Sequence, residues 1–373
     1  MNGDSTTLEI FLELAAIKSP PGRERAVADR VIEFLDGLGL EPDEDGAGAG
    51  IGSEIGNILC RLASTAAGTP IFLNAHLDTV PPTDEIEPVV EDGVVTNRRP
   101  TILGADNKAA VAAMLAAVRD LARDGAPHAG VELLLTPMEE VGLRGAKGFD
   151  SSRLEARFGY CYDHAAAVGE IVLAAPSQRT FRLTFHGRPA HSGIAPEQGR
   201  SAILAAARAI AAMPLGRLDE QTTTNVGLIE GGVAGNIVPP ECTLRAEARS
   251  RDEGRLAETV QAMLDAATAA ADETGCRLEA VVTSEYQGYR FGQDDEPVAL
   301  AARALAECGH RVRYIESGGG ADANVFNAAG LPCVNLCNGM AEIHTSDEHI
   351  AVADLDAMTA VTRKLIDLAR SGG

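Results

Sequence analysis

Apolar residues recur along the chain with two different spacings, and these spacings predict helices that alternate with strands. In residues 8–17 and 26–38 they lie three and four positions apart, as on one face of a helix. Residues 57–62 and 71–75 are short apolar runs of the kind found in buried strands. An alanine-rich helix is predicted next, followed by two more strands, at 109–123, 131–136 and 158–162. This alternation indicates an α/β fold with a mostly parallel sheet covered on both faces.

The pattern changes near residue 177. A strand, a helix, two strands, a second helix and a last strand are predicted at 180–186, 201–213, 223–230, 243–250, 252–273 and 278–284. This βαββαβ order is typical of a ferredoxin-like unit. From about residue 289 the first rhythm resumes, with helices at 297–308, 323–329 and 352–370 and strands at 312–316 and 332–336. We therefore expect one α/β domain built from 1–176 and 289–373, interrupted by an inserted α+β domain at 177–288.

Length and composition fit this division into two domains. A chain of 373 residues is too long for one ordinary core, and an apolar fraction of 45% excludes a disordered or fibrous protein. No apolar run reaches membrane-spanning length, and residues 1–18 lack the basic and uninterrupted apolar regions of a signal peptide. The seven cysteines are scattered and never spaced as CxxC, which is typical of reduced thiols. We therefore expect a cytoplasmic protein.

The net charge is strongly negative. The chain has 54 acidic residues against 32 basic ones, a formal charge of −22. Such a surface repels nucleic acid and anionic lipid, so both are excluded as partners. Part of the acidic excess is a solvated surface, and part can belong to a site.

Acids and histidines end four successive apolar segments. They are His76 and Asp78, Asp106, Glu139 and Glu140, and Asp163. Taken singly, each has an ordinary structural explanation, such as a helix cap for Asp106 or a solvated loop for the two glutamates. In an open α/β sheet, however, ligands bind beyond the carboxyl ends of the strands. The repetition at equivalent positions therefore predicts one shared site, in which Asp78 can orient the ring of His76.

These segments resemble those of a known enzyme family. The chain reads H-L-D-T-V from His76, G-A-D-N-K from Gly104, E-E-V-G from Glu139, D-H from Asp163 and I-H-T-S-D-E from Ile343. This set is similar to the zinc exopeptidase family that includes peptidase T, glutamate carboxypeptidase, succinyl-diaminopimelate desuccinylase and aminoacylases. The likeness runs from Ser19-Pro20-Pro21-Gly22 to the C-terminal helix. It implies an α/β/α catalytic domain. It also implies that the inserted domain is a lid, and that two subunits form a homodimer through this domain.

The resemblance also implies a role for each residue of the site. Two zinc ions per subunit share Asp106, while His76 and Asp163 complete one position and Glu140 and His344 the other. Glu139 is the general acid and base, Asp78 supports His76, and the peptide bond after Asp106 is cis. Nitrogen and oxygen donors with open positions suit catalytic zinc, and Co²⁺ or Mn²⁺ can take the same ligands.

Outer residues follow from the same resemblance. The segment 187–193 is similar to the one whose histidine, here His191, steadies the developing oxyanion, often across a dimer interface. Asn236 and Arg249 match positions that line the substrate pocket. Arg249 is expected to bind a substrate carboxylate through its planar fork, although a surface arginine at a strand end is the alternative.

The same resemblance implies roles for two further segments. A substrate-lining loop is implied at 318–324, including Gly319, while Asp322 is expected to cap the helix that follows. Glu348 is similar to a family position near the metal-binding histidine, here His344, and is a weaker candidate for support.

The function expected from this set is hydrolysis of the N-terminal residue of short peptides, as in an aminopeptidase or tripeptidase. The segments 334–336, 343–345 and 317–324 are most similar to the peptidase T branch. A zinc carboxypeptidase or an N-acyl amino acid deacylase is the alternative on the same centre. A non-catalytic peptide-binding relative is a third reading, but such a protein is expected to lose ligands or Glu139, and this chain keeps them all.

Overall fold

The computed structural model describes residues 6–371, so residues 1–5 of the N-terminal stretch considered above lie outside the described residues. The chain forms two compact units. Unit 1 comprises residues 6–173, 290–316 and 321–371, and unit 2 comprises Ala174–Tyr289 and Ser317–Gly320. Each unit has its own apolar core.

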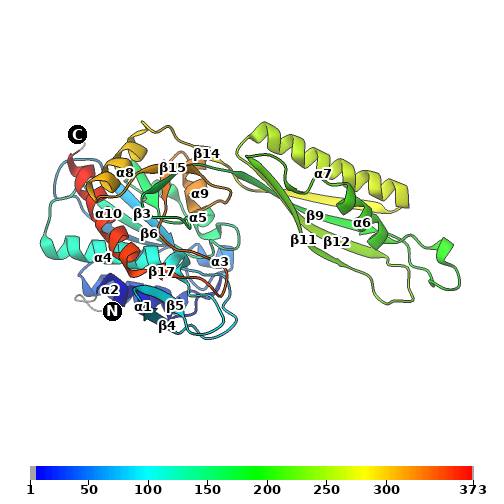
Figure 1. Cartoon of the computed structure of the whole chain (residues 1–373), viewed down its shortest axis with the longest axis horizontal. Helices are drawn as coiled ribbons and strands as arrows, with labels where there is room; N and C mark the ends of the chain where they lie inside the picture. The colour runs from blue at the N-terminus through cyan, green and yellow to red at the C-terminus, as the bar shows by residue number, and fades with distance from the viewer. Residues whose placement is uncertain (1–5, 372–373) are drawn as a thin grey trace. The chain divides into compact units, whose positions relative to one another are not determined.

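A nine-stranded sheet forms the centre of unit 1 (Figure 1). Its strands are β1 (Asp43–Glu44), β2 (Ile58–Leu62), β3 (Ile71–His76), β6 (Val131–Thr136), β7 (Phe158–Cys161), β8 (Glu170–Ala175), β14 (Tyr289–Arg290), β15 (Arg313–Glu316) and β16 (Cys333–Leu336). The order is β1-β2-β6-β3-β7-β16-β8-β14, with β15 paired to β8. β6, β3, β7 and β16 run parallel, while β2 and β8 pair antiparallel at either side of them. The mostly parallel sheet predicted from the sequence is confirmed.

Helices cover the sheet of unit 1 on both faces, as the continuous apolar strands require. The helices are α1 (Thr7–Ala15), α2 (Arg25–Gly37), α3 (Gly48–Ile51), α4 (Ala105–Asp124), α5 (Arg144–Gly148), α8 (Glu296–Glu307), α9 (Asp322–Ala328) and α10 (Val352–Ser371), with a 3₁₀ turn at Ser151–Arg153. α1, α4 and α10 pack on one another, and α5 contacts α3 and α9. Residues 105–118 of α4 are all buried, because its alanines let β3 and the neighbouring helices approach closely.

Unit 1 also contains a small sheet that is not among the predicted elements. β4 (Pro88–Glu91) and β5 (Val94–Asn97) form a hairpin, and β17 (Ile350–Ala351) pairs with β5. Asp92 and Gly93 make the turn, with φ values of 49° and 77°. An Asp-Gly pair between short apolar runs is a strong local signal for such a hairpin, so the sequence did contain the information.

Unit 2 is the predicted ferredoxin-like domain. It contains β9 (Ser177–His186), α6 (Ala202–Ala212), β11 (Thr222–Gly231), β12 (Glu241–Ser250), α7 (Glu253–Thr274) and β13 (Arg277–Tyr286), with a short β10 (Gly216–Arg217) and a 3₁₀ turn at Pro196–Gln198. The antiparallel sheet has the order β10-β11-β12-β9-β13. Both helices pack on one face of this sheet, where the core of the unit lies.

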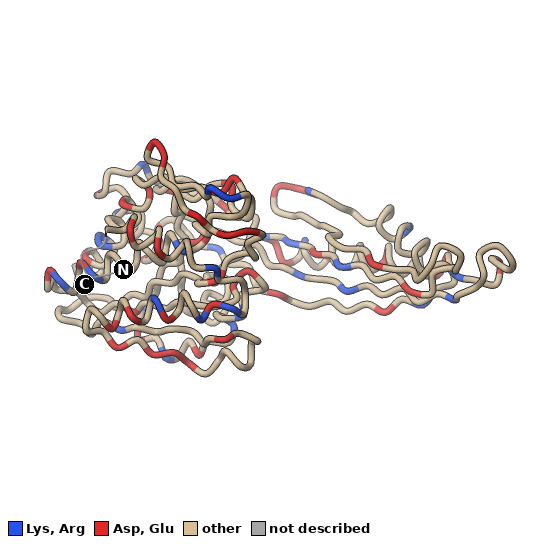
Figure 2. The backbone as a smooth tube through the Cα atoms, turned by 90° about the horizontal axis from the view of Figure 1, so that it is seen from below, with Lys and Arg blue, Asp and Glu red and all other residues tan. Residues whose placement is uncertain are grey.

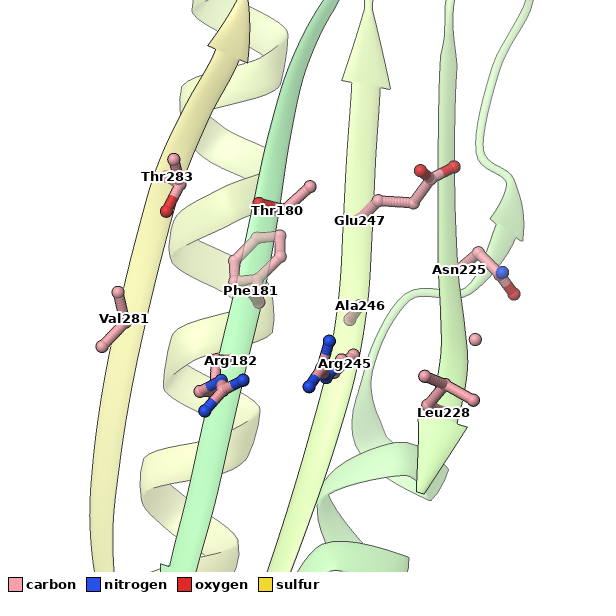
Figure 3. Close-up of a pocket in the computed structure, with 11 residues that line it drawn as sticks. Thr180, Phe181, Arg182, Asn225, Leu228, Arg245, Ala246, Glu247, Val281 and Thr283 are labelled. Carbon is pink, nitrogen blue, oxygen red and sulfur yellow. The ribbon is translucent and has the colours of Figure 1, made fainter. Parts of the chain in front are cut away.

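The other face of that sheet carries polar and charged side chains together with a few exposed apolar ones. Acidic and basic residues both occur along its strands (Figure 2). Arg182 of β9 lies opposite Arg245 of β12, with Val281 and Leu228 on the strands to either side (Figure 3). Polar side chains on this face and apolar ones beneath it give the alternation of a half-buried antiparallel sheet.

Among residues 6–371, no helix combines the length and the apolar character needed to cross a membrane.

Candidate functional site

The carboxyl ends of three parallel strands bring the predicted site residues of unit 1 together. His76 is the last residue of β3 and pairs with Thr136, the last residue of β6. Glu139 and Glu140 follow β6, and Asp163 follows β7 on the other side of β3. Neighbouring parallel strands end at the same edge of a sheet, so these side chains meet there as the sequence pattern predicts.

One group of donor atoms surrounds the ring of His76. Its Nε2 lies 3.2 Å from Oδ1 of Asp106 and 3.6 Å from Oδ1 of Asp163. The Nδ1 of His76 faces the backbone carbonyl oxygen of Asp78 at 2.9 Å. A carbonyl oxygen only accepts, so Nδ1 donates to it, and Nε2 is the ring nitrogen that could bind a metal ion.

A second group of donor atoms surrounds His344. Its Nε2 lies 3.2 Å from Oδ2 of Asp106 and 3.0 Å from Oε1 of Glu140. His344 has a left-handed backbone, with φ of 64°. This is an uncommon conformation for a residue other than glycine and is typical of functional sites.

Asp106 joins the two groups, because Oδ1 faces His76 and Oδ2 faces His344. Two ligands on one tetrahedral zinc ion, each about 2.1 Å from the metal, lie roughly 3.4 Å apart. The separations of 3.0 to 3.6 Å therefore fit two divalent ions that share Asp106. Glu139 also offers an oxygen within 4.8 Å of donor atoms of His76 and Asp163.

The electrostatics of the site favour positive charge. Burial would lower the pKa of His76, but the carboxylates of Asp163, Asp106 and Asp78 raise it well above its usual value. Hydrogen bonds to Asp106 and Glu140 raise the pKa of His344 to about 10. Burial, followed by the charge of Asp163, raises the pKa of Glu139. Both imidazole positions thus lie in the negative potential that a cation site needs.

Asp78 has a wider role than the sequence suggests. Its Oδ1 is 3.4 Å from Nδ1 of His76, but it also accepts a hydrogen bond from the amide of Glu139 at 2.9 Å. Its Oδ2 accepts from the amide of Glu140 at 3.1 Å. One buried carboxylate therefore orients the loop that bears both glutamates as well as the imidazole.

Glu348 holds the backbone around Asp106. It is buried and accepts hydrogen bonds from the amides of Leu103, Gly104 and Asp106, at 2.7, 2.8 and 2.9 Å. The helix-cap reading of Asp106 is wrong, because Gly104 is the N-cap of α4 and the Asp106 carboxylate faces the two histidines. The peptide bond between Asp106 and Asn107 is cis, as the resemblance implies.

Two further side chains support the site. Asn335 of β16 accepts a hydrogen bond from the amide of Asp163 and donates one to its carbonyl, both at 2.9 Å. In the sequence this residue stands out only as part of a segment that resembles the peptidase T branch. The expectation that Asp322 caps α9 is wrong: Ala321 is the N-cap, and the buried Asp322 carboxylate accepts a hydrogen bond from the hydroxyl of Thr136.

The candidate substrate residues of the inserted domain form two pairs within unit 2. The amide of Ser192, next to His191, donates to the carbonyl of Asn236 at 3.0 Å, and His191 forms a β-bridge with Ile237. Both His191 and Asn236 are exposed.

Arg249 forms the second pair, with Gly319. An added Cβ at Gly319 would lie 4.0 Å from Nη1 of Arg249. Arg249 also pairs with Glu247, with Nε to Oε1 at 3.1 Å and Nη2 to Oε2 at 3.0 Å. It lines a hollow of about 240 Å³ with Arg217, Arg251 and Gly318.

The two pairs lie at opposite ends of the unit 2 sheet. The Asn236 loop leads into β12 at Glu241, and Arg249 lies eight residues further along that strand. An extended strand rises about 3.4 Å per residue, so roughly 27 Å separate Glu241 from Arg249. A short peptide cannot span both ends of one such sheet.

The chain is similar to peptidases in sequence and in structure. Residues 72–368 match the model described as peptidase family M20/M25/M40. The uncharacterised protein YqjE of Bacillus subtilis is 40% identical over 355 residues, which cover 95% of this chain and 96% of that protein. The aminopeptidase PepT of Bacillus cereus is 39% identical with a TM-score of 0.87, covering 97% of this chain and 98% of that one. A tripeptidase of Staphylococcus aureus is 36% identical with a TM-score of 0.92, covering 98% of both.

Proposed function

We propose that this chain, which belongs to peptidase family M20/M25/M40, is a metal-dependent exopeptidase that removes the N-terminal residue from short peptides. The proposal rests on the position of Asp106. One of its carboxylate oxygens faces the donor atoms around His76, and the other faces those around His344. Similarity to an aminopeptidase and a tripeptidase supports cleavage at the N-terminus of the peptide.

In this proposal the five ligands divide between two ions. His76 and Asp163 bind one, Glu140 and His344 bind the other, and Asp106 binds both. Two divalent ions at such a centre polarise the scissile carbonyl and lower the pKa of a water molecule. The mixed nitrogen and oxygen donors favour Zn²⁺, and Co²⁺ or Mn²⁺ can replace it.

Glu139 is proposed as the group that moves the proton. Asp78 holds the amides of Glu139 and Glu140 with its two oxygens. One glutamate is then free to bind metal while its neighbour faces the substrate. Glu139 accepts a proton from the attacking water and returns it to the nitrogen of the leaving amine.

We propose that three residues of unit 2 act on the substrate. His191 stabilises the oxyanion that forms on the scissile carbonyl, and Asn236 lies beside it. Arg249, next to Gly319, binds the C-terminal carboxylate of the peptide. Because the two ends of the unit 2 sheet are too far apart for one short peptide, we propose that His191 reaches the site from the second subunit of a homodimer.

An open strand edge supports the homodimer. β10 pairs with β11 at Thr223 and Thr224, and the amide of Leu218 donates to the carbonyl of Thr222. No strand among the described residues pairs with residues 225–231 of β11 on that side. Leu228 and Ile229 on this strand are each 51% exposed, and Ile203 and Leu204 of α6 are exposed as well. Such an edge is a template for pairing with another chain.

Blocking the N-terminus of a substrate tests which end is recognised. We expect kcat/KM to be at least about tenfold higher for a free tripeptide than for its N-acetylated form, because acetylation removes the charged amino group and leaves the polar groups of the site that would bind it unpaired. The measurement uses protein loaded with Zn²⁺, Co²⁺ or Mn²⁺. Preference for the acetylated peptide would instead support a deacylase or carboxypeptidase. Failure to cleave any peptide with metals bound would support a non-catalytic binding protein.

Replacing Arg249 by Ala tests recognition of the substrate carboxylate. A charge-assisted hydrogen bond is worth about 1.5–3 kcal/mol, so KM for a free tripeptide is expected to rise about 10- to 100-fold. The kcat should change little, because Arg249 does not contact the scissile bond in this proposal. A tripeptide amide, which lacks the carboxylate, serves as the control, and its KM should be the same for both proteins. An equal increase for the amide would contradict the role.

A further inference from the structure

The loop that carries the two adjacent glutamates begins with a strained residue. Met138 has a left-handed backbone, with φ of 55°, which is unfavourable for a residue other than glycine. Such a conformation persists only where the surroundings fix it. Its carbonyl accepts from the amide of Arg144 at 3.0 Å, and the carbonyl of Glu139 accepts from Gly142 and Leu143.

Three successive amides of this loop donate to buried carboxylates. The amides of Glu139 and Glu140 donate to Asp78, as described above. The amide of Met138 donates to Oε1 of Glu24 at 3.2 Å. Glu24 and Met138 are 114 positions apart in the sequence, so this contact depends on the tertiary fold.

Glu24 is fully buried although it stands at the start of a helix. It is the N-cap residue of α2, but its side chain makes no capping hydrogen bond. Its Oε1 also accepts from the amide of Gly22 at 2.7 Å, and its Oε2 accepts from the hydroxyl of Ser53 at 2.9 Å. A buried carboxylate is costly unless it is hydrogen-bonded. Here three donors and the positive end of α2 stabilise it.

We propose that Glu24 is a positioning residue that sets the direction of Glu139 by holding the amide of Met138 in its left-handed turn. This inference rests on the proposed function, in which Glu139 moves the proton. Without the acceptor, Met138 relaxes toward an ordinary backbone conformation and turns the side chain of Glu139 away. A displacement of about 1 Å at a catalytic group is enough to cost about 10²-fold in rate.

Variants of Glu24 separate a hydrogen-bond acceptor from a charge. Glu24→Gln keeps one oxygen for the amides of Gly22 and Met138, while its NH₂ group can donate to the Ser53 hydroxyl. We expect its kcat to stay within about threefold of the unaltered enzyme, whereas Glu24→Ala loses about 30-fold in kcat with KM and bound metal unchanged. Glu24→Asp keeps the charge but is too short to reach Met138, so it should lose kcat as well and replaces the alanine variant if that does not fold.

Glu132 offers a matched control at the other end of the same strand. It is buried near the start of β6 and accepts from the amides of Glu155 and Ala156 at 2.9 and 2.8 Å. Glu132→Ala removes a similar backbone-binding carboxylate far from the glutamate loop. It should lower the free energy of unfolding but leave the kcat of the folded enzyme unchanged.

Amide hydrogen exchange gives a readout that does not depend on activity. In Glu24→Ala or Glu24→Asp, the amides of residues 138–140 should exchange at least about tenfold faster than in the unaltered protein, while Glu132→Ala leaves them unchanged. The role of Glu24 is overturned if the amides of residues 138–140 exchange at an unchanged rate in Glu24→Ala and Glu24→Asp, or if kcat is unchanged in these variants. It is also overturned if Glu24→Gln loses as much kcat as they do. If the unaltered protein has no peptidase activity with metals bound, the proposed function fails, and the exchange rates still decide whether Glu24 fixes this turn.

Discussion

Replacing Glu139 by Gln is expected to lower kcat for a free tripeptide by about 10³-fold, because the amide cannot accept a proton from water or return it to the leaving amine. The variant should still bind two metal ions per subunit. Glutamine has nearly the shape of glutamate, and Asp78 holds the loop through backbone amides that the substitution leaves in place. Steady-state kinetics and metal analysis of the purified protein provide the two measurements.

The neighbouring glutamate supplies the control for this experiment. In the proposed assignment Glu140 binds metal beside His344, so Glu140→Gln should lose one ion of the two as well as activity. The alternative is that Glu139 is itself a ligand, since it offers an oxygen near His76 and Asp163. Loss of a metal ion from Glu139→Gln at the concentration that saturates the unaltered protein would support that alternative and contradict the role as base.

Replacing His191 by Ala is expected to lower kcat by about 10²- to 10³-fold, the usual effect of removing one donor to a developing oxyanion. KM and metal content should change little, because His191 lies in unit 2 and is not among the metal ligands. If His191 acts on the neighbouring subunit, a defect in one chain can be repaired by another. Mixing His191→Ala with Glu139→Gln subunits tests this, since each variant alone is nearly inactive.

The mixed dimers contain one intact site. It combines Glu139 from the His191→Ala chain with His191 from the Glu139→Gln chain. After random exchange of equal amounts, half of the dimers are mixed, so about a quarter of the original activity should return. Light scattering checks that the protein is a dimer before and after mixing. No recovery from subunits that have exchanged would place His191 in the site of its own chain, and a monomer with full activity would contradict the homodimer.

The sequence predicts the parts of the site that depend on local position. His76 and the acids at the ends of β6 and β7 meet because parallel strands end at one edge, and strand ends are visible in the apolar pattern. The hairpin at residues 88–97 also depends on neighbouring residues alone. Its Asp92-Gly93 turn is a local signal, although the hairpin was not predicted.

The carboxylates that hold the backbone around the site were not predictable in this way. Glu24 precedes a predicted helix and belongs to no motif, and its contact with Met138 is set by tertiary packing. Glu348 is separated from Asp106 by 242 positions, so no spacing in the sequence links them. The sequence favours a helix cap for Asp322, since the position lies at the start of a predicted helix. Only the fold shows that its carboxylate faces Thr136.

The place of β16 in the sheet has a consequence for synthesis of the chain. β16 lies between β7 and β8, yet it is made about 160 residues after them. During translation β7 therefore lacks its neighbour β16 while almost all of unit 2 is synthesised. Unit 2 is nearly continuous in sequence. The proposed metal positions include His344, which follows β16 in the sequence, so they also stay incomplete until unit 2 has been made. A nascent chain consequently lacks part of the proposed centre for as long as unit 2 is being synthesised.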